Sequence, residues 1–340
     1  MEQKNPDPSD FRQMIIDSPG QFRAGMELAD RIRVAGKFDK IMISGMGGSA
    51  LPGNLFRIYL NDLFRRDGEK PLPVFQNRFY SLPPESFDDC LNLVCSYSGN
   101  TEETLSSFEE AIAAGLPTVA LSAGGKLEDR CGETGTPHIR LPMPFPDFQP
   151  RIGTGYFFGA LFAILANHGL IPDARAEVLA SADRLATRMT DIETKGKDLA
   201  GTLAGKTPVV YASVKYKAVA MVWKIKINEN AKTPAFWNFF PELNHNEMVG
   251  FTDSQAPFTV VMLRDPQDHP KNLKRFEATA GLLREKGIPV EIIDMQEDDV
   301  FGKIFGSILL ADFASYHLAI RYGIDPTPVD MVEKLKKLLA

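Results

Sequence analysis

One stretch of the chain, from Asn228 to Gly250, combines acid, base and amide side chains with a run of aromatic residues. It reads NENAKTPAFWNFFPELNHNEMVG and contains the carboxylate of Glu229 and the imidazole of His245. Neither a helical period nor a strand alternation fits this pattern. Polar groups inside an apolar segment cost free energy unless they are hydrogen-bonded. The stretch is therefore either an acid–base site or a buried, asparagine-rich loop that bonds its own backbone, and the residues alone leave both interpretations open.

Three hydroxyls and a glycine follow a predicted strand in the sequence SYSGNT at 96–101. The first N–H groups of a helix have no helical partner, and that end of the helix dipole is positive. The hydroxyls of Ser96, Ser98 and Thr101 could surround a phosphate together with such N–H groups. A simple helix cap would need only one hydroxyl. We therefore predict a phosphate site here.

A glycine turn, GMGGSA at 45–50, lies between a predicted strand and a predicted helix. It lacks the GxGxxG spacing of dinucleotide-binding folds and the lysine of a P-loop, so it gives little support for nucleotide binding. Gly47 and Gly48 would let a ligand approach the backbone, and Ser49 could contact a phosphate or a sugar. A plain tight turn remains the alternative interpretation of this motif.

These motifs belong to a repeating pattern of strand, turn and helix. Such alternation predicts a parallel sheet with helices on both of its faces. Ligands of these sheets bind at the carboxyl ends of the strands, where both turns fall. The predicted strands are 40–44, 73–75, 91–96, 117–121, 138–141, 208–211, 258–263 and 289–293, and long helical patterns cover 156–166, 174–199, 271–286, 304–322 and 329–340.

The length of 340 residues exceeds what one hydrophobic core usually organises, so two domains are expected. A proline-rich passage ends the first domain at about residue 153 and contains Arg151. We predict N-terminal helices and a first, phosphate-binding domain over 1–153 and bridging helices over 154–200. The second domain, with the Asn228–Gly250 stretch and a C-terminal helix, would cover 201–340.

Composition narrows the functional classes further. The net charge of −6 is spread along the chain, whereas a nucleic-acid surface needs concentrated lysine and arginine. No apolar run approaches the roughly 20 residues of a membrane span, and the N-terminus has no apolar signal core. The three cysteines form no metal-binding spacing and are expected to be reduced thiols. We expect a cytoplasmic protein without nucleic-acid or membrane partners.

Three motifs together resemble those of the bifunctional phosphoglucose/phosphomannose isomerases of the sugar isomerase (SIS) superfamily. They are GMGGSA at 45–50, SYSGNTEETL at 96–105 and NENAKTPAFWNFFPELNHNE at 228–247, and the resemblance extends to the closing DPTPVDMVEKLKKLL at 325–339. It implies an α/β chain of two SIS domains, each a flavodoxin-like three-layer αβα sandwich with a parallel sheet, in a homodimer. It also implies conversion of glucose 6-phosphate and mannose 6-phosphate to fructose 6-phosphate, in glycolysis and gluconeogenesis, without a metal or cofactor.

The resemblance also assigns roles to individual residues. Glu229 matches the base that moves the proton between C1 and C2, and Arg151 matches an arginine near the reacting carbons. His245 and Lys334 match groups associated with ring opening, although Lys336 and Lys337 lie close enough to be confused with Lys334. Thr327 is the candidate for a threonine linked to mannose use. The phosphate-binding positions match Ser49, Ser96, Ser98 and Thr101, with Gly47 and Gly48 as further substrate contacts.

The chemistry is consistent without the resemblance. Isomerisation through an enediol(ate) needs a base, and a carboxylate in a partly apolar setting gains basicity. The developing negative charge needs a nearby cation, which Arg151 could supply. Histidine titrates near neutrality and suits proton transfer during ring opening, although His245 could also be a structural histidine bonded to its neighbours. His245 and Glu247 supply only two ligands and no HExxH motif is present, so we expect no metal.

Two departures from the family pattern and two rival functions remain. The turn Tyr211–Lys215 has fewer glycines than the family pattern leads us to expect. Lys226, just before the 228–250 stretch, is an unusual residue for that position. One rival is a SIS-type sensor that binds a sugar phosphate without converting it. The other is an isomerase of glucose 6-phosphate alone.

Overall fold

The computed structural model describes residues 5–68 and 70–339, which form two compact units. Among the described residues, the five-stranded unit comprises 17–68 and 70–186, and the four-stranded unit comprises 187–339 together with 5–16. The segment 154–200, predicted to bridge two domains, is divided between these units at residue 187.

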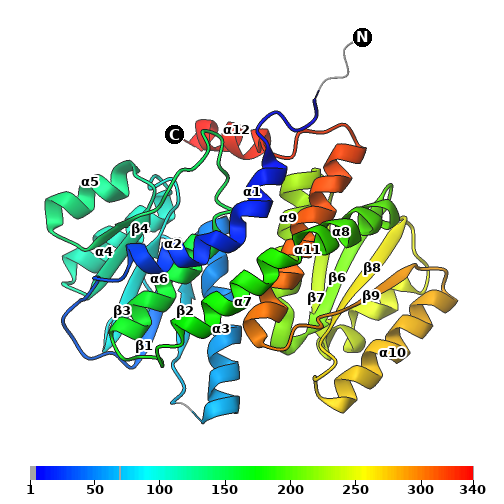
Figure 1. Cartoon of the computed structure of the whole chain (residues 1–340), viewed down its shortest axis with the longest axis horizontal. Helices are drawn as coiled ribbons and strands as arrows, with labels where there is room; N and C mark the ends of the chain where they lie inside the picture. The colour runs from blue at the N-terminus through cyan, green and yellow to red at the C-terminus, as the bar shows by residue number, and fades with distance from the viewer. Residues whose placement is uncertain (1–4, 69, 340) are drawn as a thin grey trace. The chain divides into compact units, whose positions relative to one another are not determined.

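The sheet of the five-stranded unit is parallel throughout, with the strand order β2-β1-β3-β4-β5 (Figure 1). This is the order of flavodoxin-like folds, in which ligands bind at the carboxyl end of the sheet where the strand order reverses. The predicted αβα sandwich is confirmed for this unit. Its strands are β1 (Lys40–Gly45), β2 (Val74–Asn77), β3 (Cys90–Cys95), β4 (Thr118–Ser122) and β5 (His138–Arg140).

Helices cover both faces of this sheet. Helices α2, α3 and α6 pack together on one face. Helix α3 contacts β1, β2 and α6, and α6 contacts α2. The other face carries α4 and α5 (Figure 1). As its apolar sequence predicts, α6 is buried over nearly its whole length. The helices are α2 (Gln21–Leu28), α3 (Gly47–Asp67), α4 (Glu102–Ala113), α5 (Gly125–Thr134), α6 (Thr154–Asn167) and α7 (Arg175–Thr187).

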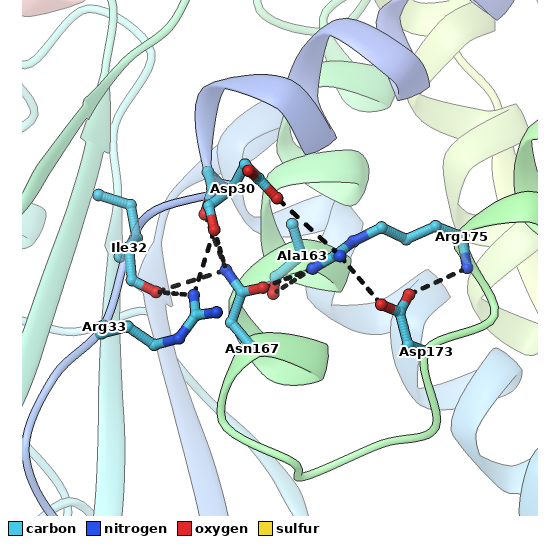
Figure 2. Close-up of polar contacts among 8 residues, drawn as sticks. Asp30, Ile32, Arg33, Ala163, Asn167, Asp173 and Arg175 are labelled. Carbon is cyan, nitrogen blue, oxygen red and sulfur yellow. Dashed lines mark hydrogen bonds and ion pairs between the residues drawn. The ribbon is translucent and has the colours of Figure 1, made fainter.

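Polar side chains join the ends of three helices in this unit (Figure 2). The Asn167 amide, at the end of α6, donates to the carbonyls of Ala29 and Asp30 after α2, at 2.9 and 3.0 Å. Arg175, at the start of α7, donates to the Asn167 side chain and to Asp173 at 2.9 Å. The Asn167 bonds fix the chain just after α2 against the end of α6, and Arg175 joins the start of α7 to the same asparagine.

The four-stranded unit repeats the same topology with one strand fewer, in the order β7-β6-β8-β9, and all of its pairs are parallel. Two parallel sheets in one chain fit the predicted pair of SIS domains. The strands are β6 (Thr207–Ser213), β7 (Phe236–Phe240), β8 (Phe258–Arg264) and β9 (Val290–Asp294). Strand β7 lies in the stretch for which the sequence indicated neither a helix nor a strand, so that prediction is wrong for these five residues.

Three helices of this unit, α8, α9 and α11, pack together on one face of the sheet, and α10 packs on the other face (Figure 1). The helix predicted over 174–199 is wrong as a single element, because α7 and α8 are separate and Arg188 between them has non-helical dihedral angles. The helices are α1 (Phe11–Asp17), α8 (Met189–Leu203), α9 (Lys217–Ala231), α10 (Pro270–Glu285), α11 (Val300–Arg321) and α12 (Asp330–Leu339).

Helix α11 corrects another prediction. By length and composition it could cross a membrane, with a mean hydropathy of 1.2 over its most apolar window. The expectation that no segment approaches a membrane span is therefore wrong for this helix. Because 78% of the window is buried and α11 packs against α8 and α9, it has the burial of a core helix of the four-stranded unit.

Candidate active site

Two of the predicted phosphate motifs lie side by side in the five-stranded unit. Strands β1 and β3 are neighbours and end together, with Gly45 paired to Cys95. The turns that follow these two strands therefore start at the same edge of the sheet. They are joined directly, because the Ser49 hydroxyl oxygen accepts the backbone N–H of Tyr97 at 2.9 Å.

The loop at 96–101 is held in one shape by short-range bonds. The Ser96 hydroxyl donates to the Thr101 hydroxyl at 3.0 Å, and the exposed Ser98 hydroxyl accepts the N–H of Asn100 at 3.2 Å. Gly99 has a φ of 68°, and a Cβ there would lie only 1.8 Å from the carbonyl oxygen of residue 124. Thr101 occupies the N-cap position of α4, yet its side chain makes no capping hydrogen bond. That absence weakens the interpretation of these hydroxyls as a simple helix cap.

Gly48, in the first turn of α3, lets the backbone of a buried arginine approach closely. A Cβ on Gly48 would lie 2.9 Å from the backbone nitrogen of Arg151, so only glycine permits this close approach. Gly47 has a φ of 49° and faces open space. Arg151 is 1% exposed, and its guanidinium donates to the Gln149 side chain at 3.0 Å. The hydroxyls and helix N-terminal N–H groups at this strand edge are suited to binding an anion, and the Arg151 backbone packs against them at Gly48.

The predicted base, Glu229, lies in the last turn of α9 in the four-stranded unit and is half-buried. Buried polar contacts to α11 hold this part of α9. The Lys226 ammonium lies 2.7 Å from the Asp312 carboxylate, and the Asn230 amide donates to the Ser315 hydroxyl at 2.9 Å. The lysine that the sequence marked as unusual is therefore a partner in a buried ion pair one turn before Glu229.

His245 ends a short 3₁₀ helix, Glu242–His245, and is exposed. Its imidazole makes no hydrogen bond or ion pair with the residues that the structure describes. The carboxylates around it have partners of their own. Glu242 accepts the Asn246 amide at 2.9 Å, and Glu247 accepts the Tyr211 hydroxyl at 2.6 Å. These carboxylates hold the local fold around the histidine.

The two C-terminal candidates differ in burial. Thr327 is 3% exposed, and its backbone N–H donates to the Asp325 carboxylate at 2.8 Å. Lys334, Lys336 and Lys337 all lie on α12 and are exposed, and Lys336 forms a 2.7 Å ion pair with Glu333. The assignment of Lys334 remains a prediction.

At the corresponding edge of the four-stranded sheet, the chain's own charges pair with one another. The fully buried Asp265 carboxylate, just after β8, lies 2.7 Å from the Lys303 ammonium and accepts the Tyr216 hydroxyl at 2.9 Å. Lys215 lies 3.5 Å from the same carboxylate. Tyr216 ends the short 3₁₀ helix Val214–Tyr216, which takes the place of a glycine turn after β6. This edge is therefore occupied by a side-chain anion, whereas the edge of the five-stranded sheet presents hydroxyls and glycines.

The sequence analysis did not identify several residues that hold the candidate site residues in position. Tyr97 supplies the N–H that joins the two turns, and Gln149 holds the Arg151 guanidinium. Lys232, two residues before Pro234, bonds to a carbonyl 94 residues further along the chain. Residue types alone carry no signal for contacts of this range. Among residues 5–68 and 70–339, no group of three or more histidine, cysteine or acidic side chains is placed to hold a metal ion.

Comparisons with known proteins agree on one family. Residues 192–339 match the family model described as the bacterial phospho-glucose isomerase C-terminal SIS domain. The bifunctional phosphoglucose/phosphomannose isomerase of Caldicellulosiruptor bescii is 35% identical over 96% of this chain and 98% of its own. A relative from Sulfolobus acidocaldarius, named D-glucosamine-6-phosphate 4-epimerase, is 30% identical over 88% of this chain and 89% of its own.

A solved structure supports the fold alone. The tagatose-6-phosphate ketose/aldose isomerase of Escherichia coli superposes with a TM-score of 0.69, covering 96% of this chain and 97% of the other, at 16% identity.

Proposed function

The chain belongs to the bifunctional phosphoglucose/phosphomannose isomerase family of sugar-phosphate isomerases, and we propose that it interconverts glucose 6-phosphate and mannose 6-phosphate with fructose 6-phosphate. The observation that supports this most is the edge of the five-stranded sheet. There the Ser49 hydroxyl, in the first turn of α3, is joined to the loop that carries Ser96 and Ser98, and Gly48 packs against the backbone of Arg151. Such a site would bind the substrate phosphate and use that binding energy to position the reacting carbons.

The proposed reaction moves one proton between two carbons. The cyclic sugar opens when a proton reaches the ring oxygen and one leaves the C1 hydroxyl, for which His245 and Lys334 are the candidates. Glu229 then removes the proton from C2 of the open aldose, which leaves an enediolate, and returns it to C1 to give the ketose. Arg151 would stabilise the negative charge that develops on oxygen. Glucose and mannose 6-phosphate differ only at C2 and share one enediolate, so a single base can serve both, with Thr327 as the candidate contact for mannose.

Each step uses groups of the chain itself, and we propose a metal-independent enzyme. We also propose a cytoplasmic homodimer without nucleic-acid or membrane partners. All three cysteines are buried and form no disulfide, as expected for reduced thiols. A single monomeric species by light scattering at assay concentration would contradict the dimer.

The deciding experiment measures fructose 6-phosphate formed from glucose 6-phosphate and, separately, from mannose 6-phosphate, each with and without excess EDTA. We expect turnover of both substrates, unchanged by the chelator. Turnover of glucose 6-phosphate alone would narrow the function to a glucose-6-phosphate isomerase. Binding without turnover would favour the sensor, and epimerisation of glucosamine 6-phosphate without ketose formation would place the chain with the epimerase relative.

Two glutamate variants test the role of the base. Glu229→Gln keeps the shape of the side chain but cannot accept a proton, so we expect turnover of both substrates to be lost. Binding of 6-phosphogluconate, measured by calorimetry, should stay within about threefold, since phosphate binding does not need this carboxylate. Glu242→Gln is the matched control, because Glu242 lies in the same stretch but bonds to Asn246. Near-normal turnover by the Glu229 variant would remove it from the mechanism.

A further inference from the structure

Helix α9 ends in an unusual way. The residue that caps its C-terminus, Lys232, has φ 54° and ψ 30°, the left-handed conformation. Glycine is the residue that most often ends a helix in this conformation, because a Cβ makes it unfavourable. Among the described residues, the only other non-glycine residues with positive φ are Asp10 and Asp89. Aspartate tolerates this conformation better than most side chains. A lysine at this position therefore has a backbone cost that its side chain must offset.

The side chain of Lys232 makes two contacts that a glycine could not make. Its ammonium donates to the carbonyl of Glu229, one of the last-turn carbonyls that have no partner within a helix. It also donates to the carbonyl of Pro326 at 2.9 Å. The neighbouring residue Thr233 completes the helix end, because its hydroxyl donates to the carbonyl of Ala231 at 3.1 Å.

The second contact reaches the segment between α11 and α12. Pro326 directly precedes Thr327, whose side chain is buried and whose N–H is held by Asp325. One ammonium thus connects the turn that carries the predicted base with the segment that carries the predicted mannose contact. Both ends belong to the four-stranded unit.

We propose that Lys232 is a positioning residue that fixes the Pro326–Thr327 segment against the last turn of α9, and so sets the distance between Thr327 and Glu229. The inference rests on the proposed function. Loss of these bonds leaves the phosphate-binding turns in place but loosens the Pro326–Thr327 segment relative to Glu229. Turnover depends steeply on such positioning. The effect should therefore appear in kcat and in the ratio of mannose to glucose turnover, with little change in KM.

Lys232→Gly separates this role from a purely structural one. Glycine suits the left-handed backbone better than lysine, so the melting temperature should stay the same or rise. Both charge-assisted hydrogen bonds of the ammonium are lost, so kcat should fall about tenfold while KM stays within about twofold. The two substrates should be affected unequally. Lys232→Asn, which tolerates the conformation but cannot reach Pro326, should behave like the glycine variant, and Lys232→Arg should recover much of the activity.

The matched control is Lys286→Gly. Lys286 ends α10 in the same unit and is exposed like Lys232, but its backbone has φ −88° and its side chain makes no hydrogen bond or ion pair with the described residues. Its variant should keep full activity. The inference is overturned if Lys232→Gly and Lys232→Asn retain wild-type kcat and substrate ratio, or lose activity only in proportion to lost stability. If the unaltered chain isomerises neither substrate, the proposed function fails first and the inference fails with it.

Discussion

The hydroxyl oxygen of Ser49 accepts the backbone N–H of Tyr97 at 2.9 Å, and this bond joins the first turn of α3 to the loop after β3. Because the bond uses an oxygen lone pair, the hydroxyl proton is still available for a phosphate oxygen. A residue that the sequence suggested only as a ligand therefore also holds two loops together. Removing it should affect stability as well as binding.

Ser49→Ala should raise the KM of both hexose phosphates and lower stability. The buried N–H of Tyr97 would lose its partner, which costs about 1–3 kcal/mol of unfolding free energy. Ser98→Ala is the matched comparison, since the exposed Ser98 hydroxyl accepts only the neighbouring N–H of Asn100. It should raise KM about tenfold, as for a lost hydrogen bond to a charged group, with little change in stability. Urea unfolding and initial-rate kinetics on both variants check this. Equal stability of the two variants would contradict the joining role of Ser49.

Gly48→Ala should reduce catalysis through Arg151. The added Cβ would lie 2.9 Å from the Arg151 backbone nitrogen, so the arginine segment must shift. We expect kcat to fall about tenfold or more, because a small displacement of a group near the reacting atoms is costly. Gly47→Ala is the control. Its Cβ would meet open space, and the φ of 49° costs about 1 kcal/mol of stability without moving Arg151. A lower kcat for the Gly47 variant than for the Gly48 variant would contradict this argument.

The sequence predicted the architecture because each buried strand is a short apolar run before a turn. It did not predict β7, since Phe236–Phe240 has aromatic side chains on four of five positions and shows no alternation. The strand is recognisable only from its pairing with β6, which depends on the fold of the whole unit. Helix α9 runs to Ala231, into the stretch for which the sequence indicated no helix, because polar residues in its last turn hide the helical period. Its actual end depends on the backbone of Lys232 and on Pro326, far along the chain.

The phosphate-binding half of the candidate site was easier to predict from the sequence than the rest. Its hydroxyls and glycines follow strand ends directly, so local order places them at one edge. His245 and Lys334 do not follow a strand end, so the local sequence does not place them. In the structure each is exposed, on a different element. Their roles depend on contacts between residues far apart in the sequence, and residue types and spacing do not predict such contacts.

Replacing one partner of the buried ion pair between Lys226 and Asp312 should lower the free energy of unfolding more than replacing both. Lys226→Met alone leaves a buried carboxylate without its cation, and we expect a loss of about 3–5 kcal/mol in unfolding free energy. Adding Asp312→Leu removes that charge and should restore most of the stability, since apolar pairs of similar volume pack well. Chemical denaturation of both single variants and of the double variant gives the coupling energy. Additive losses would show that the two charges do not depend on one another.

The Asp265 carboxylate should make stability depend on pH at the acid end. Burial alone would raise its pKa, but hydrogen bonds from Lys303 and from the Gln267 N–H outweigh burial and lower the pKa below its usual value. Its stabilising contribution is therefore complete above the unfolded-state pKa of about 3.9 and is lost as pH falls through the folded-state pKa. Asp265→Asn cannot form the ion pair, so it should cost about 3 kcal/mol at pH 7. This difference from the wild type should begin to shrink below about pH 3.9, where the unfolded wild-type carboxylate takes up a proton, and should shrink further as pH falls through the lower folded-state pKa.

Urea unfolding of wild type and Asp265→Asn at pH 7 and at about pH 3.5 measures how much unfolding free energy the substitution costs at each pH. Glu333→Gln is the control in the same unit, because Glu333 forms only an exposed ion pair with Lys336. Its variant should differ from wild type by less than about 1 kcal/mol at either pH. If the cost of Asp265→Asn is the same at both pH values, the loss comes from packing of the new amide, and the ion pair with Lys303 does not stabilise this edge of the sheet. If the cost shrinks at low pH, the ion pair between Asp265 and Lys303 stabilises this edge of the four-stranded sheet.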